Sequence, residues 1–226
     1  MRTLTLLLLL SSSIVFAQNS SEKWYLGLQG GVGKSFRSLK PMEDGGANNL
    51  WERNKYEISQ PAWNVGMVVG RRLFHRLWLE GGYSFSYYSV LYSREYGPNE
   101  LYHYRHQYYN TDISGALKFY TNEGRFKGFV FAGSEANIII TWRETLAYYV
   151  NGETAGPHRH YPASGGYNWL AFSIQGGAGV SYQIGKRLQL EARYLGKSNL
   201  TPSRAQQSVE DYLNYHAMNV GLLMRL

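Results

Sequence analysis

The sequence predicts an all-β protein, an eight-stranded, antiparallel, up-and-down transmembrane β-barrel. Three observations support this: apolar residues alternate with small or polar ones, the connections alternate between short and long, and small residues crowd one face. Each alternating segment has at least the roughly 9 to 11 residues that a tilted membrane strand needs. The eight segments are residues 24–35, 60–71, 76–89, 109–121, 127–142, 168–182, 187–198 and 215–226.

The last segment shows the two-residue period most clearly. Every second residue from Met218 to Leu226 is apolar, whereas the interleaved positions are mostly small or polar. This period is typical of a strand with one apolar face. The order of Asn219, Gly221, Met224 and Leu226 also resembles the C-terminal signal by which barrels are recognised for insertion, although the usual final residue is Phe. The resemblance implies a transient partner, the barrel-assembly machinery.

The N-terminus predicts export. Arg2 precedes an apolar run at residues 4–10, and Ala17 ends a Ser-rich stretch, which is typical of a signal peptide at residues 1–17 with a cut before Gln18. The barrel domain is then residues 18–226. Since no later apolar run reaches the length of a membrane helix, such a chain would cross a bilayer as a closed barrel.

The connections sort by length. Short turns lie at residues 72–75, 122–124 and 185–186, and long connections at 36–59, 90–108, 143–167 and 199–214. This order places both termini at the short-turn end, the periplasmic side of outer-membrane barrels, with four long loops outside.

The size of the polar-face residues predicts which face is inside. A secreted barrel with an apolar interior is the alternative, but an eight-stranded barrel has room only for close-packed side chains, and a water-facing surface would be rich in Lys and Glu. Aromatic side chains are expected on the lipid side at two levels, because membrane interfaces favour them. The small residues are Gly27, Gln29, Gly31, Asn64, Gly66, Gly82, Ser84, Ser114, Ala116, Gly133, Ser173, Gly177, Gly179 and Ser181, and the aromatic ones are Trp24, Phe119 and Tyr182, then Trp63, Phe85, Tyr87, Trp142 and Tyr194.

Charged residues also fall on the polar face, where each would be costly unless paired. Glu80 and Lys118 lie at similar heights on adjacent strands and are expected to pair. A charge-bridged lumen implies a structural plug without an open pore, and a proton or ion path is the alternative. The predicted network comprises Glu80, Asp112, Lys118, Glu135, Glu191, Arg193 and Arg225.

The chain as a whole resembles the small eight-stranded outer-membrane barrels of the OmpA and OmpX type. The cut after Ala17 and the paired glycines at residues 30–31, 81–82 and 176–177 are similar to the PorT-like outer-membrane β-barrel family. This resemblance implies that the protein lies in a Gram-negative outer membrane. It also implies an accessory role in type IX secretion, although no residue motif of this chain is specific for that role.

Two kinds of chemistry are candidates. His103 with His106, or His158 with His160, offer metal ligands, but without Cys or a carboxylate partner at ligand spacing no metal is predicted. The alternative for these Tyr-rich and His-rich loops is that the strands continue beyond the membrane and the aromatic side chains stiffen them. Ser198 and His216 face the lipid side on neighbouring strands, with Glu210 and Asp211 between them, as in a lipid A deacylase. That family carries its His two residues before its Ser, where this chain has Gly196.

The function expected from the sequence is therefore non-enzymatic and without a cofactor. The exposed long loops suit adhesion to a protein or glycan, for which Tyr and Arg side chains are good anchors, or a role in envelope integrity. The formal net charge of +7 is compatible with outer-membrane lipid and lipopolysaccharide as anionic partners. Nucleic acid is not expected as a partner of an exported protein. A type IX secretion accessory and a lipid A-modifying enzyme are the alternatives.

Overall fold

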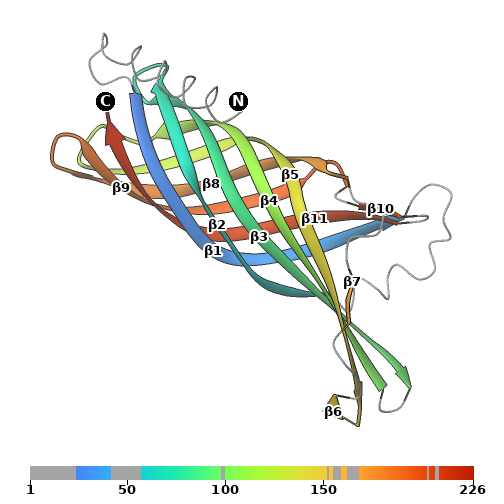
Figure 1. The fold of residues 1–226 in the computed structure, drawn as a ribbon. Coiled ribbons are helices and arrows are strands. Elements are labelled where there is room, and N and C mark those ends of the chain that lie inside the picture. The colour runs from blue at the N-terminus through green and yellow to red at the C-terminus, as the bar shows by residue number, and fades with distance from the viewer. Residues whose placement is uncertain are drawn as a thin grey trace, which may run out of the picture.

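The computed structural model is a closed barrel of eight long antiparallel strands (Figure 1). It describes residues 24–41, 57–97, 100–151, 153–154, 159–161, 168–202, 204–206 and 209–226, so the predicted signal peptide lies outside the described residues. The predicted fold class is confirmed. The long strands are β1 (Trp24–Pro41), β2 (Glu57–Arg72), β3 (Leu77–Gly97), β4 (Glu100–Tyr120), β5 (Phe126–Val150), β8 (Leu170–Ile184), β9 (Leu188–Asn199) and β11 (Val209–Arg225).

Three short strands lie against the long ones. β6 (Glu153–Thr154) and β7 (Arg159–Tyr161) pair with β5, and β10 (Arg204–Gln206) pairs with β11. The described part of the chain contains no apolar helix of membrane-spanning length.

The barrel closes between its first and last strands. β1 pairs with β11 from Tyr25 opposite Arg225 to Pro41 opposite Val209. At the short-turn end, the amide of Leu226 donates a hydrogen bond of 3.0 Å to the carbonyl of Trp24. Closure leaves no unpaired edge along this seam, as a membrane-spanning sheet requires.

The outer surface of the barrel is apolar. Leu28, Val32 and Val220 are 65%, 70% and 57% exposed, and Phe119, Tyr182 and Tyr194 also point outward. Their inward neighbours in sequence are buried or small, as expected from the two-residue period. Such a continuous apolar belt around a polar interior is typical of a barrel surrounded by lipid.

The interior also contains large aromatic side chains, whose inward position was not predicted from the sequence. Tyr25, Tyr88, Tyr120, Phe129 and Tyr215 are almost fully buried and lie on inward positions of their strands. They occupy the volume that the glycines and serines leave open, so small and large residues together fill the lumen.

One predicted loop is wrong. Residues 90–108 were expected to form a long connection, but β3 continues to Gly97 and β4 begins at Glu100. β5 also extends to Val150, beyond Ile138, the last residue that pairs with β8. We call the resulting three-stranded extension of residues 91–97, 100–109 and 139–150 the β3–β5 arm (Figure 1). Tyrosines are good strand formers, and here they outweigh the turn-like composition.

The orientation of Trp142 is also corrected. Tyr109 is opposite Thr141, but Asn110 is opposite Ile139, so Ile140 is an extra residue in β5. Such a β-bulge reverses the inward and outward phase of the strand. Trp142, expected to face lipid, is therefore buried opposite the inward Tyr108.

Candidate functional sites in the lumen and beyond the barrel

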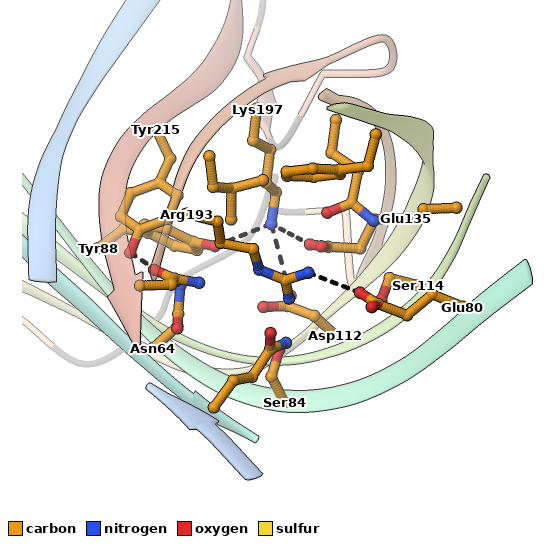
Figure 2. A pocket seen from close by; sticks show the side chains of 16 residues that line it. Asn64, Glu80, Ser84, Tyr88, Asp112, Ser114, Glu135, Arg193, Lys197 and Tyr215 are labelled. Atoms are coloured by element: carbon orange, nitrogen blue, oxygen red, sulfur yellow. Dashed lines mark hydrogen bonds and ion pairs between the residues drawn. The ribbon is translucent and has the colours of Figure 1, made fainter. Parts of the chain in front are cut away.

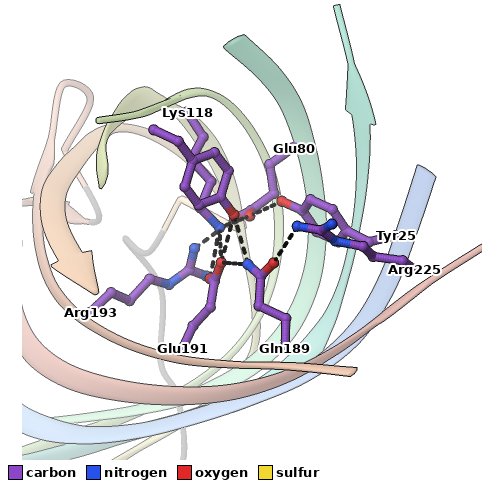
Figure 3. A network of polar contacts seen from close by, with 8 residues as sticks. Tyr25, Glu80, Lys118, Gln189, Glu191, Arg193 and Arg225 are labelled. Carbon is purple, nitrogen blue, oxygen red and sulfur yellow. Dashed lines mark hydrogen bonds and ion pairs between the residues drawn. The ribbon is translucent and has the colours of Figure 1, made fainter. Parts of the chain in front are cut away.

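The short-turn half of the lumen holds an ion cluster centred on Lys118 (Figure 3). The ammonium nitrogen of Lys118 lies 2.9 Å from a carboxylate oxygen of Glu80 and 2.7 Å from one of Glu191. Arg193 reaches the other oxygen of Glu80 at 2.6 Å. We call these residues the Lys118 cluster. The structure thus pairs Glu80 with Lys118, the two residues for which the sequence predicts an ion pair.

Neutral side chains complete the Lys118 cluster. The hydroxyl of Tyr25 donates to Glu80, and the hydroxyl of Tyr120 donates to Glu191 at 2.8 Å. Gln189 donates to Glu191 and accepts a hydrogen bond of 3.1 Å from Arg225. The ammonium of Lys118 also lies 4.4 Å from the ring centre of Phe129, a cation–π distance. Two carboxylates, two central cations and several hydrogen bonds replace the water that these charges lose on burial.

A second cluster lies toward the other end of the lumen, centred on Lys197 (Figure 2). Lys197 contacts the carboxylate of Glu135, donates to the Tyr88 hydroxyl at 2.8 Å, and lies 3.8 Å from Asp112. Ser86 donates to Asp112. Asp112 and Glu135 thus do not join Glu80 and Lys118, and their shared cation is a residue absent from the predicted network. Lys197 has the same parity as Glu191 and Arg193, so the two-residue period could have identified it.

The lumen retains little free space. An enclosed cavity between the two clusters has a volume of about 20 Å³ (Figure 2). This is enough for roughly one water molecule. Asn64 donates to the Tyr215 hydroxyl at 2.9 Å across this region.

The predicted nucleophile and base have other partners. Ser198 lies opposite Asn214 and donates to its side-chain oxygen at 2.7 Å. His216 lies opposite Gly196, and its Nδ1 atom is 2.6 Å from the Tyr194 hydroxyl. The side chains of Glu210 and Asp211 lie outside the described part. The described contacts therefore form no Ser–His pair of the kind that activates a nucleophile.

Among the described residues, the candidate metal ligands do not lie together. His103 packs against Tyr149 with ring centres 5.0 Å apart. His106 is three residues further along β4, so it lies on the opposite face, where it is buried. His158 and the side chain of His160 lie outside the described residues. Within the described residues, no group of three potential His, Cys, Asp or Glu ligands is present.

The β3–β5 arm carries tyrosine contacts across its strands. Tyr102 and Tyr148 are a cross-strand pair with ring centres 4.4 Å apart, and Tyr104 lies 6.0 Å from Tyr92. Arg105 and Arg143 are exposed on the other face. The arm is therefore a hydrogen-bonded sheet with a row of tyrosines on one face, and two arginines and the His103–Tyr149 ring pair on the other.

The predicted insertion signal has the expected alternation. Asn219 and Gly221 are buried, while Met224 and Leu226 are 44% and 40% exposed.

A closed eight-stranded barrel with a polar lumen and an apolar belt defines the class of this protein: a small transmembrane β-barrel of the outer-membrane type. No family model and no curated protein matches the chain. The chain is similar to several solved outer-membrane barrels. One is Neisserial surface protein A, with 11% sequence identity and a TM-score of 0.46 over 90% of this chain and 97% of that chain. Another is the outer membrane protease OmpT from Escherichia coli, with 9% identity and a TM-score of 0.48 over 93% of this chain and 100% of that chain. Ail, the attachment invasion locus protein of Yersinia pestis, is also similar, with 11% identity and a TM-score of 0.35 over 89% of this chain and 99% of that chain.

Proposed function

We propose that the protein is a non-enzymatic outer-membrane barrel that contacts a protein or glycan through the β3–β5 arm. The observation that carries this proposal is the continuation of three strands beyond the last pairing of β5 with β8. Strands that only span a membrane do not need this length. Aromatic and Arg side chains on a rigid sheet are the anchors that binding surfaces use most, because they bury a large area with little loss of conformational entropy.

The filled lumen supports a structural role for the barrel itself. The Lys118 and Lys197 clusters cross the interior, and the cavity between them has room for about one water. In this proposal the barrel is plugged and conducts no ions, and it serves as an anchor for the arm.

The proposed orientation follows from the turns. Residues 1–17 act as the signal peptide, the residues from Asn219 to Leu226 as the insertion signal, and both termini are periplasmic. The arm then lies outside the cell. The surrounding partners are outer-membrane lipid and lipopolysaccharide, with the barrel-assembly machinery acting during insertion.

The test measures binding of the purified barrel, held in lipid nanodiscs, to an array of glycans and a panel of extracellular proteins. Replacing Tyr102 and Tyr148 together by Ala removes one cross-strand pair and is expected to weaken binding at least tenfold. Phe119→Ala, at the lipid-facing surface, is the matched aromatic control and is expected to leave binding unchanged. The proposal is wrong if the wild-type barrel binds nothing in either panel, or if both variants bind equally.

A further inference from the structure

A cavity of about 170 Å³ lies at the short-turn end of the barrel, separate from the enclosed cavity of the lumen. Its inner end is formed by the buried rings of Trp78 and Tyr120, which meet edge to face with centres 6.3 Å apart. Tyr120 also belongs to the Lys118 cluster, so this short-turn cavity ends against that cluster. The lining residues are Arg72, His75, Arg76, Trp78, Tyr120, Asn122, Glu123, Lys127 and Arg225.

The lining carries four permanent cations and one carboxylate. Glu123 lies 3.5 Å from Nδ1 of His75 and also acts on Lys127, so this single carboxylate offsets only part of the positive charge. Arg72 ends β2, Lys127 is near the start of β5, and Arg225 ends β11, so closure of the barrel brings together cations that are far apart in the sequence. Like charges held this close repel one another unless an anion lies among them.

Two of these cations, Lys127 and Arg72, make no ion pair or hydrogen bond among the described residues. Arg76 donates to the carbonyl of Thr121 at 3.0 Å, and Arg225 donates to Gln189. Lys127, however, is only 8% exposed, and its nearest described partner is the ring of Tyr120, with the ammonium 5.4 Å from the ring centre. Arg72 makes no described hydrogen bond or ion pair. Glu123 and Glu191 favour the charged ammonium of Lys127 without forming an ion pair with it, whereas Arg225 and Arg72 oppose it. An anion bound among these cations would offset their mutual repulsion.

We propose that the short-turn cavity binds the phosphate group of a soluble anion. Its volume is below the roughly 300 to 1,000 Å³ typical of sites for drug-sized ligands, so it suits a small oxyanion or one terminal phosphate. Guanidinium groups match the geometry of phosphate oxygens, and an ammonium adds a point charge. The strand residues that line the cavity point inward, so the barrel wall separates the cavity from the lipid belt. In the proposed orientation it opens to the periplasm, and the inference does not depend on what the arm binds.

The test is titration calorimetry with inorganic phosphate on the barrel in nanodiscs of zwitterionic lipid at low ionic strength. We expect saturable binding of one phosphate per barrel. Lys127→Gln is expected to weaken it at least tenfold, while Lys186→Gln, which removes an exposed cation from the turn between β8 and β9, leaves it unchanged. Circular dichroism confirms the fold of each variant. Arg72→Gln, at an exposed position, provides the same comparison if Lys127→Gln does not fold.

Three results would overturn the proposal. One is the absence of saturable phosphate binding, and another is equal weakening in the Lys127 or Arg72 variant and in the Lys186 control. The third is loss of phosphate binding when the nanodisc lipid is replaced by phosphatidic acid, since this would assign the cavity to a lipid headgroup.

Discussion

Lys118 shows how a narrow lumen accommodates a fully buried ammonium. One of its two carboxylate neighbours comes from the adjacent strand β3 and the other from β9 across the lumen, and aromatic rings surround its stem. The sequence could predict the contact with Glu80, because β3 and β4 are neighbours and each adjoins a short turn, at residues 72–75 and 122–124, from which the height of a residue can be counted. It could not predict the contact with Glu191, since β4 and β9 are not neighbours and meet only across the lumen, at a distance set by barrel closure.

Replacing Lys118 by Met should destabilise the barrel strongly. The variant leaves Glu80 and Glu191 facing each other without their shared cation, and breaking a buried ion pair costs about 3 to 5 kcal/mol. Urea unfolding in lipid vesicles measures the change, with Lys186→Met as an exposed control that should stay within about 0.5 kcal/mol of wild type. Equal stability of the two variants would show that the Lys118 cluster contributes nothing to the fold.

Gly33 and Gly115 test how closely the strands approach. A Cβ atom on Gly33 would lie 1.8 Å from the carbonyl oxygen of His216 in β11, whereas one on Gly115 would meet nothing within 4 Å. Gly33→Ala should therefore cost about 1 to 3 kcal/mol, as overpacking usually does, and Gly115→Ala should be close to neutral. The same unfolding assay measures both, and a neutral Gly33→Ala would contradict the close approach of β1 and β11.

At the scale of single strands, β5 shows both the strength and the limit of the two-residue period. The period correctly identifies β5 and the inward positions of Gly133 and Glu135. It fails beyond Ile140, because one extra residue reverses every later position, and nothing in the local composition marks that residue. For the same reason the sequence placed Trp142 on the wrong face.

Deleting Ile140 should leave the barrel folded. The deletion removes the extra, exposed residue and keeps Ile139 opposite Asn110 and Thr141 opposite Tyr109. Deleting Ala136 instead removes a paired residue in the middle of β5, so either Glu135 or Asn137 must leave the lumen. The urea midpoint of the Ile140 deletion should stay near that of wild type, and that of the Ala136 deletion should fall sharply. Similar midpoints would mean that the bulge does not decouple the two halves of β5.

At the scale of the whole molecule, the sequence predicted the number of long strands, their order and the polar interior, because all three depend on local periodicity. It left open whether the residues of the β3–β5 arm form loops or continued strands, because tyrosine-rich segments without a strong turn signal can be either, and pairing across strands decides between them. It also missed the short-turn cavity, whose cations come from the ends of three strands.

The absence of cysteine allows a direct test of the orientation. Glu153→Cys places a thiol beyond the end of β5, and Lys186→Cys places one in the turn between β8 and β9; both positions are exposed. A membrane-impermeant maleimide should label the first variant on intact cells and the second only after lysis. The reverse pattern would invert the proposed orientation and place the arm in the periplasm.

The seam between β1 and β11 has a consequence for biogenesis. Until β11 is in place, β1 and β9 both present open edges, and each can hydrogen-bond to another chain. The last strand of the barrel in chain order is therefore the one that closes it. A chain that lost this strand would retain two open strand edges, and each could pair with another chain and lead to aggregation.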